Sequence, residues 1–102
     1  LTSNLTKMIE EIFPTIYNKA LDIISRREHS KKEVRDKLLK KFDDLSVIED
    51  VIEKLIKNSL LNDSRYAEMY TRARKRKGFG PKRIGYELNS RGVRETLTYI
   101  AI

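Results

Sequence analysis

Arginine and lysine side chains recur between residues 65 and 83 at spacings that could bind phosphate groups. Arg72, Lys75 and Arg76 lie three or four residues apart, so a helix would place them on one face, and Arg65 would lie on the same face two turns earlier. Cationic side chains along one face can neutralise successive phosphates of a nucleic-acid strand, but such contacts do not read its sequence. The pattern therefore predicts a polyanion-binding face without sequence specificity.

A second basic group follows on the next predicted helix. Lys82, Arg83 and Tyr86 share its outer face, and an exposed tyrosine among cations could stack a nucleobase. A tyrosine at this position could equally cap the contact between two structural repeats. Arg74 and Lys77 lie closer to the apolar side of the preceding helix, where they could reach a neighbouring element.

A third basic group surrounds a predicted helix junction near residue 30. Lys31 and Lys32 stand at a helix N-terminus, where the helix dipole disfavours cations, so an anionic or acidic partner is one reading and surface charge without a specific role is the other. The complete candidate set for binding nucleic acid or a partner is Arg26, Arg27, Lys31, Lys32, Arg35, Arg65, Arg72, Arg74, Lys75, Arg76, Lys77, Lys82, Arg83, Tyr86 and Arg91.

The charge is distributed in blocks. The net charge is +7, and residues 65–94 contain ten Lys/Arg and two Asp/Glu, whereas residues 43–63 contain two Lys/Arg and six Asp/Glu. A localised basic block is the electrostatic footprint of a polyanion binder. A solvated helix surface with no special role remains the alternative, and the acidic block could pair with a basic partner or with a neighbouring repeat.

Catalytic signals are weak. His29 is the only histidine and precedes a helix cap, which favours a packing or solvent role. The sequence contains no P-loop and no GxSxG motif. Asp43-Asp44 and Glu49-Asp50 could attract a metal ion, but turn and cap roles explain them more simply. We therefore expect a non-enzymatic protein with no cofactor and no metal.

The composition suggests where the protein works. The chain of 102 residues has no cysteine, which favours a reducing, cytoplasmic setting, and no apolar stretch approaches the roughly 18 residues that span a membrane. We expect a monomer that does not bind membranes.

Helix signals are clear and strand signals nearly absent, so the expected fold class is all-α. Pro14 is expected to begin a first helix that fades near Glu28. Ser30 with Glu33 forms a capping-box pattern before a second helix, and Ser46 with Glu49 forms another before a third. Further helices are expected from Asn62, from Pro81 to Arg91 with Gly92 as its stop, and from Thr96.

The order of these elements repeats. A shift of 50 residues aligns Val34 and Leu38 with Ile84 and Leu88, and a shift of 47 aligns Ala20 with Ala67. A period of this length with three helices per unit indicates tandem three-helix repeats and an elongated molecule. The expected domains are an N-terminal segment of unknown role (1–15), repeat 1 (16–60) and repeat 2 (61–102), the last helix of which is incomplete.

The segment from Gly78 to Arg83 admits a further interpretation. Gly78-Phe-Gly-Pro-Lys-Arg83 is similar to the glycine hairpin of helix–hairpin–helix DNA binders, in which backbone amides hold a phosphate. Arg76-Lys77 replaces the usual Leu-Pro entry to that hairpin, and Gly80-Pro81 is also explained fully as a helix start.

Three motifs in one order resemble the RecX family. They are Ser25-Arg-Arg-Glu-His-Ser30 leading into Glu33-Val-Arg-Asp-Lys-Leu-Leu39, then Leu60-Leu-Asn-Asp-Ser-Arg-Tyr-Ala-Glu68, then Lys77-Gly-Phe-Gly-Pro-Lys-Arg-Ile84 with Glu87-Leu88 and Ser90-Arg-Gly-Val93. Each motif alone is common, whereas together they are specific and cover roughly residues 20–93. RecX-like proteins are usually built from three such repeats, so this chain resembles about two of them.

The resemblance implies a function that composition and spacing do not. RecX-type proteins bind filaments of the recombinase RecA on single-stranded DNA and restrain its ATP hydrolysis and strand exchange in DNA repair and recombination. The expected partners are therefore a RecA filament and single-stranded DNA, with double-stranded DNA possible. The alternatives are a sequence-tolerant DNA-binding protein without a recombinase target and a pure protein-interaction scaffold.

Overall fold

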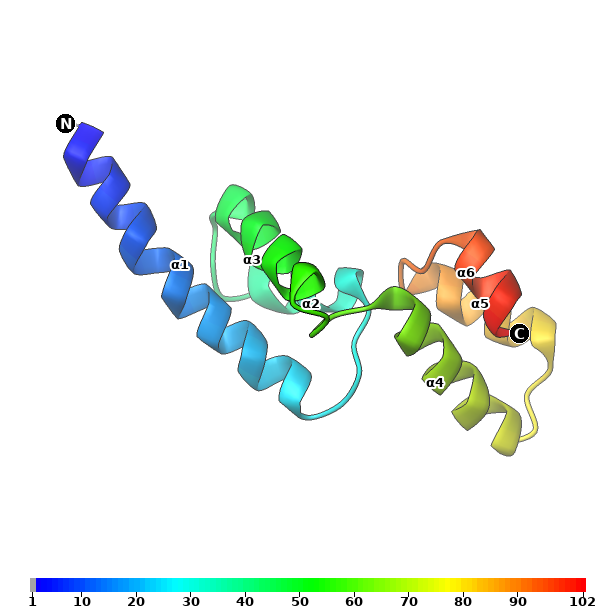
Figure 1. The fold of residues 1–102 in the computed structure, drawn as a ribbon. Helices are drawn as coiled ribbons and strands as arrows, with labels where there is room; N and C mark the ends of the chain where they lie inside the picture. Colours follow the sequence, from blue (N-terminus) through cyan, green and yellow to red (C-terminus); the bar gives the residue numbers. More distant parts are fainter. Residues whose placement is uncertain (1) are drawn as a thin grey trace.

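The computed structural model describes the backbone of residues 2–102 and the side chains of residues 7, 8 and 10–102. Within the described backbone the chain forms helices and no strands (Figure 1). The helices are α1 (Thr2–Ser25), α2 (Lys31–Leu39), α3 (Leu45–Lys57), α4 (Asp63–Arg76), α5 (Pro81–Ser90) and α6 (Glu95–Ala101).

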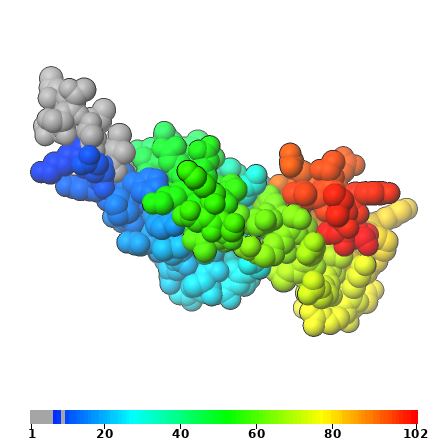
Figure 2. Space-filling view, in the orientation of Figure 1, coloured from blue at the N-terminus to red at the C-terminus, as the bar shows by residue number. Residues whose placement is uncertain are grey.

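The helices form two groups of three, one after the other along a long axis. Helices α1, α2 and α3 pack on one another, and so do α4, α5 and α6. The molecule measures 56 × 23 × 22 Å along its principal axes, and the space-filling view shows the same extended outline (Figures 1 and 2). The predicted all-α, elongated tandem of three-helix units is confirmed.

The first group has the larger hydrophobic core. Its helices bury residues at helical spacing, because an amphipathic helix turns one stripe inward. The buried residues are Ile16, Ala20, Ile23, Val34, Leu38, Val47, Ile48, Val51, Ile52, Leu55 and Leu61. Ile56 near the end of α3 is 40% exposed, whereas Val47 near its start is buried.

The second group has a small core. Tyr66, Ala67, Ile84, Leu88 and Val93 are buried there, and Met69, Tyr70, Phe79 and Leu97 are among the partly buried residues around them. Tyr66 and Tyr70 stack with their ring centroids 5.8 Å apart. Aromatic rings thus provide much of the buried apolar area of the second core, whereas aliphatic side chains provide it in the first.

Side-chain caps fix where several helices begin. The Ser30 hydroxyl accepts from the Glu33 amide while the Glu33 carboxylate accepts from the Ser30 amide, so the predicted capping box is confirmed. Asn62 caps α4, and Pro81 occupies the first turn of α5. The left-handed φ of 80° at Gly92 follows the end of α5, as expected for a helix stop.

Two predicted helix starts are wrong. Helix α3 begins at Leu45, and the side chain of Asp44 rather than Ser46 caps it by accepting from the Val47 amide. Glu49 is therefore free to pair with Arg35 on α2. Helix α6 begins at Glu95 after Arg94, and no side chain caps it, so Thr96 lies inside the helix.

The predicted start at Pro14 is also wrong, because α1 begins at Thr2 and runs through the proline. Proline has no backbone N–H, so the carbonyl of Glu10, four residues earlier, loses its usual helical hydrogen bond. The side chains of Pro14 and Glu10 are exposed to water at this point of the helix. The turn is held instead by tertiary packing, since Ile12 and Phe13 contact the first core and Phe13 stacks on Tyr17. Packing thus overrides the local preference of proline for the first turn.

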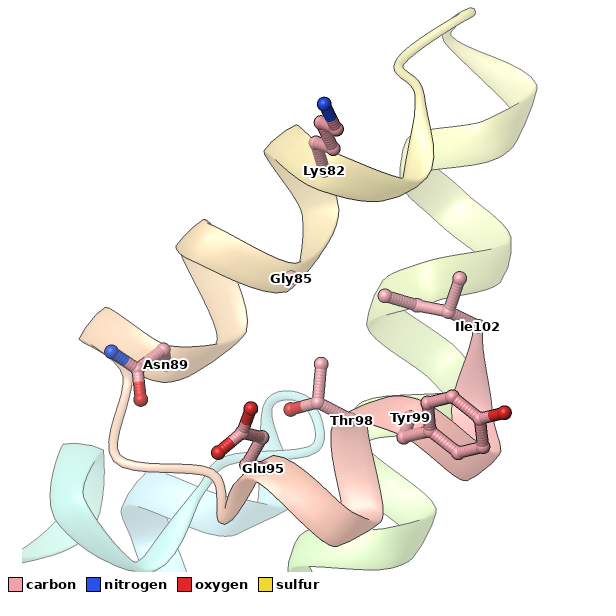
Figure 3. Close-up of a pocket in the computed structure, with 7 residues that line it drawn as sticks. All are labelled: Lys82, Gly85, Asn89, Glu95, Thr98, Tyr99 and Ile102. Atoms are coloured by element: carbon pink, nitrogen blue, oxygen red, sulfur yellow. The ribbon is translucent and has the colours of Figure 1, made fainter.

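The second and third helices of the two groups begin in the same register, but the contact between them differs. Lys31 and Pro81, the first residues of α2 and α5, are 50 residues apart, and the same shift relates Leu45 and Glu95 at the starts of α3 and α6. Arg35 and Glu49 form an ion pair between α2 and α3. The equivalent residues of the second group are Gly85 and Tyr99, and between α5 and α6 lies a cleft of about 910 Å³ (Figure 3).

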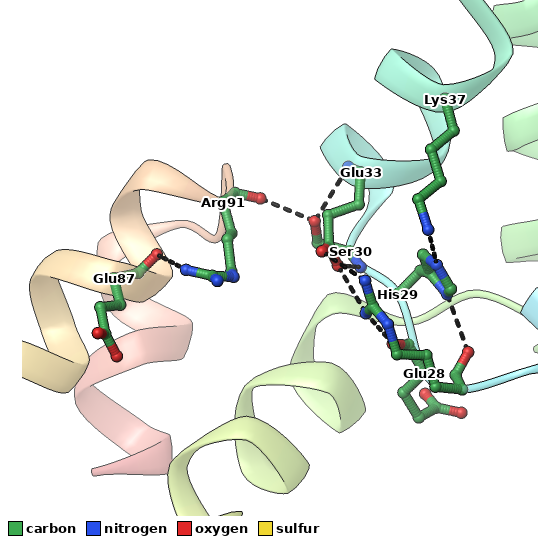
Figure 4. A network of polar contacts seen from close by, with 8 residues as sticks. Glu28, His29, Ser30, Glu33, Lys37, Glu87 and Arg91 are labelled. Carbon is green, nitrogen blue, oxygen red and sulfur yellow. Dashed lines mark hydrogen bonds and ion pairs between the residues drawn. The ribbon is translucent and has the colours of Figure 1, made fainter. Parts of the chain in front are cut away.

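Polar contacts join the two groups (Figure 4). The Ser30 hydroxyl donates to the Arg91 carbonyl at 2.8 Å, and the Lys31 amide donates to the buried carboxylate of Asp63 at 2.8 Å. The backbone of Gly92 passes close to α2, so that a Cβ at this glycine would lie 2.6 Å from the Cβ of Lys32. Hydrogen bonds and a close backbone approach, rather than a shared core, therefore set the relative placement of the two groups.

Candidate nucleic-acid interface

The outer face of α4 carries cations that have no acidic partner among the described residues. Arg72, Lys75 and Arg76 on this face are exposed, as is Lys77 just beyond the end of the helix, while Tyr66 on the opposite face is buried. No carboxylate side chain within the described residues forms an ion pair with these four cations, and the ammonium of Lys75 donates to the carbonyl of Ile102 at 3.2 Å. Arg72, Arg76 and Lys77 are therefore available to bind phosphates without giving up a hydrogen bond or an ion pair to a described side chain, and Lys75 would give up only its bond to the Ile102 carbonyl.

Glu87 organises the side of this face that turns toward α5. Its carboxylate accepts from Arg74 through two bonds of 2.9 Å, from the Tyr70 hydroxyl at 2.8 Å and from Arg83 at 3.3 Å. The hydrogen bonds from Arg74 and Tyr70 lower the pKa of Glu87 to about 2. Two arginines of the candidate set, Arg74 and Arg83, thus share one carboxylate within the protein, which balances only one of their two charges.

The low pKa of Glu87 predicts a specific pH dependence of stability. The folded carboxyl binds a proton less readily than the unfolded one, so its stabilising effect is complete above the ordinary value of 4.5 and is lost as the pH falls toward about 2. Glu87→Gln should therefore melt below the wild type at neutral pH, and the gap should close below pH 4.5. Thermal melts followed by circular dichroism between pH 7 and pH 2 measure the gap.

The exposed carboxylate of Glu68 on α4 provides the control, because it forms no ion pair among the described side chains. Glu68→Gln should melt close to the wild type at each pH. A Glu87→Gln gap that stays constant from pH 7 to pH 2 would contradict the assignment.

Helix α5 adds exposed groups beside α4. Tyr86 is 76% exposed, and Lys82 is exposed on the same helix. Phe79, in the loop before α5, contacts the guanidinium groups of both Arg74 and Arg83, which are 3.8 and 4.5 Å from its ring centroid. These cation–π contacts hold the loop against both helices. Phosphate binding by the backbone of Gly78 and Gly80, in the manner of a glycine hairpin, stays a prediction.

Most predicted cations of the first group are engaged internally. Arg27 pairs with Glu33 at 3.0 Å, Lys32 pairs with Asp36 at 2.8 Å, and Arg35 pairs with Glu49. For Glu33, burial opposes ionisation, but hydrogen bonds from Arg27 and from the Ser30 amide dominate and lower its pKa. Arg26 lies 3.5 Å from Asp22, an exposed pair of little strength. Binding of a polyanion here would require exchange of these partners.

Two further predicted residues lie at the junction between the groups. Arg65 donates to Glu28 at 2.7 Å and to the Ser59 carbonyl at 3.1 Å. Arg91 has its guanidinium 4.7 Å from the ring centroid of Tyr70, and its carbonyl accepts from Ser30. In this structure both arginines hold the fold together.

His29 is buried at the same junction. Its Nδ1 lies 2.9 Å from the Arg27 carbonyl and its Nε2 lies 2.8 Å from the Lys37 ammonium (Figure 4). A carbonyl can only accept and an ammonium can only donate, so Nδ1 carries the proton of a neutral ring. Burial lowers the pKa of His29, which favours the neutral ring. The geometry agrees with the expected packing role.

Sequence reasoning missed residues that line two hollows. Arg94 lines a hollow of about 210 Å³ between the two groups together with the predicted Lys31, and Arg94 falls in the basic block without belonging to any recognisable motif. Asn89 and Tyr99 line the cleft between α5 and α6. The one signal in the sequence that could have indicated this cleft is the presence of Gly85 where the first repeat has the long side chain of Arg35.

Other kinds of site are not seen in the described part of the chain. Among these residues no cluster of three or more His, Cys, Asp or Glu side chains could hold a metal ion. Within residues 2–102 each helix is too short or too polar to cross a membrane.

The fold and the basic face define a helical-repeat protein of two three-helix units. Residues 17–55 match the family model of the first three-helix domain of RecX, and residues 62–98 match that of the second. The chain belongs to the RecX family, whose members are regulatory proteins.

Individual relatives agree with this assignment. The chain is 40% identical over 74 residues to the regulatory protein RecX of Halorhodospira halophila, and the aligned region covers 72% of this chain and 46% of that protein. It is also 40% identical over 74 residues to the RecX of Pseudomonas syringae pv. tomato, covering 48% of that protein. The crystal structure of RecX from Lactobacillus salivarius matches with a TM-score of 0.85 and 33% identity over 90% of this chain and 60% of that chain. The chain thus spans about half the length of the curated relatives it matches.

Proposed function

We propose that this chain binds filaments of RecA on single-stranded DNA and restrains the activity of RecA, without catalysing a reaction itself. Family membership supports the recombinase as the target, because restraint of RecA is what the resemblance to RecX implies. The single observation that carries the contact with DNA is the row of exposed cations on α4, Arg72, Lys75 and Arg76, which have no acidic partner among the described residues.

The geometry of the row suits a strand of phosphates. Arg72 and Arg76 stand one turn apart on α4, a rise of about 6 Å. Lys82 and Tyr86 on α5 extend the exposed surface, so a strand lying across both helices meets cations first and an aromatic ring beside them. The contacts are to backbone phosphates, and the proposed binding is therefore tolerant of DNA sequence.

Fluorescence anisotropy at one salt concentration tests the proposal. The chain is titrated against labelled single-stranded DNA and against the same DNA coated with RecA and a slowly hydrolysed ATP analogue. Markedly tighter binding to the filament is the expected result, and the chain should then slow the ATPase activity of RecA on that DNA. Equal or weaker binding to the filament would reject the recombinase target and leave a sequence-tolerant DNA-binding protein.

A further inference from the structure

The cleft of the second group lies between α5 and α6. Its lining comes from both helices, as Figure 3 shows: Lys82, Gly85, Asn89, Glu95, Thr98, Tyr99 and Ile102. In the first group the side chain of Arg35 occupies the position of Gly85 and pairs with Glu49. Here the glycine has no side chain to bridge the helices, and tyrosine replaces the glutamate.

The two ends of the cleft differ in chemistry. Tyr99 and Ile102 form an aromatic and aliphatic end, and the Tyr99 side chain, 85% exposed, is held by little of the protein. Asn89 and Glu95 form a polar end with hydrogen-bond donors and acceptors. A flat ring with a hydrogen-bonding edge would contact both ends at once.

A buried hydroxyl adds to the polar side. Thr98 is 8% exposed, and its Oγ1 finds no hydrogen-bond partner among the described residues. The hydroxyl lies on the side of the cleft where Asn89 and Glu95 lie (Figure 3). Buried polar groups normally have a partner, so a hydroxyl without one marks this side of the cleft as polar and incompletely satisfied.

Lys82 and Glu95 balance each other in the lining of the cleft, so it is the cations of the neighbouring surface that favour a nucleic acid over a neutral ligand. Lys82 lines the cleft, and the exposed cations of α4 and the exposed Tyr86 belong to the same three-helix group. An acidic peptide would satisfy these cations but would leave Tyr99 without a stacking partner. Proteins that bind single strands combine backbone-tracking cations with aromatic side chains on which bases stack.

We propose that the cleft receives one nucleobase of the bound single strand, stacked on Tyr99 with its polar edge toward Asn89 and Glu95. The inference rests on the proposed function, since the cations of α4 and α5 must first bring the strand to the cleft. It adds a site for the base to an interface that otherwise contacts only phosphates.

The test compares an oligothymidine with an abasic strand of the same length, by anisotropy at low salt. Tyr99→Ala removes the stacking surface, and Gly85→Leu fills the cleft without changing charge. A Cβ at residue 85 would meet Ile102 and Thr98 at 3.6 and 3.8 Å, which are ordinary contacts. Ile100→Ala, an equally exposed change on α6 outside the lining, is the control.

The expected result is a loss of roughly tenfold in affinity for oligothymidine in Tyr99→Ala and in Gly85→Leu, with little change for the abasic strand. Ile100→Ala should bind both strands like the wild type. Equal affinity of the wild type for both strands, unchanged by Tyr99→Ala, would overturn the base site while leaving phosphate binding intact. Failure of the wild type to bind either strand would instead overturn the proposed DNA contact and the base site with it.

Discussion

Charge reversal at both Arg72 and Arg76 should abolish binding to single-stranded DNA. Both side chains are exposed and have no acidic partner in the described part of the chain, so their substitution breaks no internal contact. Arg72→Glu with Arg76→Glu removes two phosphate contacts and adds repulsion at the same place. We expect a loss of more than about 100-fold in affinity at low salt.

The salt dependence gives an independent measure of the same contacts. Four to six phosphate contacts to a single strand correspond to a slope of roughly −3 to −4 in a plot of log affinity against log salt concentration. Loss of two contacts should reduce the steepness of this slope by about 1.4. Anisotropy titrations of each protein at several salt concentrations measure both the affinity and the slope.

A reversal of equal charge at another place separates the site from general electrostatics. Lys40 and Lys41 are exposed beyond the end of α2 and lie outside the candidate set. Lys40→Glu with Lys41→Glu should weaken binding only slightly and leave the slope unchanged. If this control loses as much affinity as the variant on α4, the site lies elsewhere or is spread over the whole surface.

Truncation of Leu88 should unfold the second group of helices and leave the first folded. Leu88 is fully buried in the smaller core, and Leu→Ala at such a position costs about 2–5 kcal/mol. Since α4–α6 have little other buried aliphatic area, they should lose protection from hydrogen exchange in Leu88→Ala while α1–α3 keep theirs. Hydrogen exchange measured segment by segment after proteolysis tests this.

Leu55→Ala is the matched variant, because Leu55 is fully buried in the first core. It should raise exchange mainly in α1–α3. A uniform rise in both groups after either substitution would mean that the junction couples them into a single cooperative unit.

Local signals in the sequence predicted much of the fold. The capping box at Ser30, the cap at Asn62 and the proline at the start of α5 act within a few residues, so they can be read without knowledge of the fold. The predictions failed where distant residues decide. Packing of Phe13 carries α1 through Pro14, and the cap at Asp44 releases Glu49 for a pair with Arg35.

The candidate interface likewise contains features that local spacing predicted and features that distant residues decide. Helical spacing placed Arg72 and Arg76 on an exposed face, and the structure agrees. Spacing did not indicate that Arg65 would form an ion pair with Glu28, or Arg74 with Glu87. Neither carboxylate lies on α4, since Glu28 belongs to the loop between α1 and α2 and Glu87 belongs to α5. The role of each candidate residue in binding stays a prediction that the charge-reversal variants test.

The polar junction also bears on how the sequence can change over time. The side chains of the two cores do not interleave, and the halves meet through a few contacts at Ser30, Asp63 and Gly92. A substitution that alters the volume of one core therefore demands no compensating substitution in the other. One half can exchange an ion pair for an open cleft, as at Gly85 and Tyr99, while the other keeps Arg35 and Glu49. Duplicated units joined in this way are free to diverge into a structural half and a binding half.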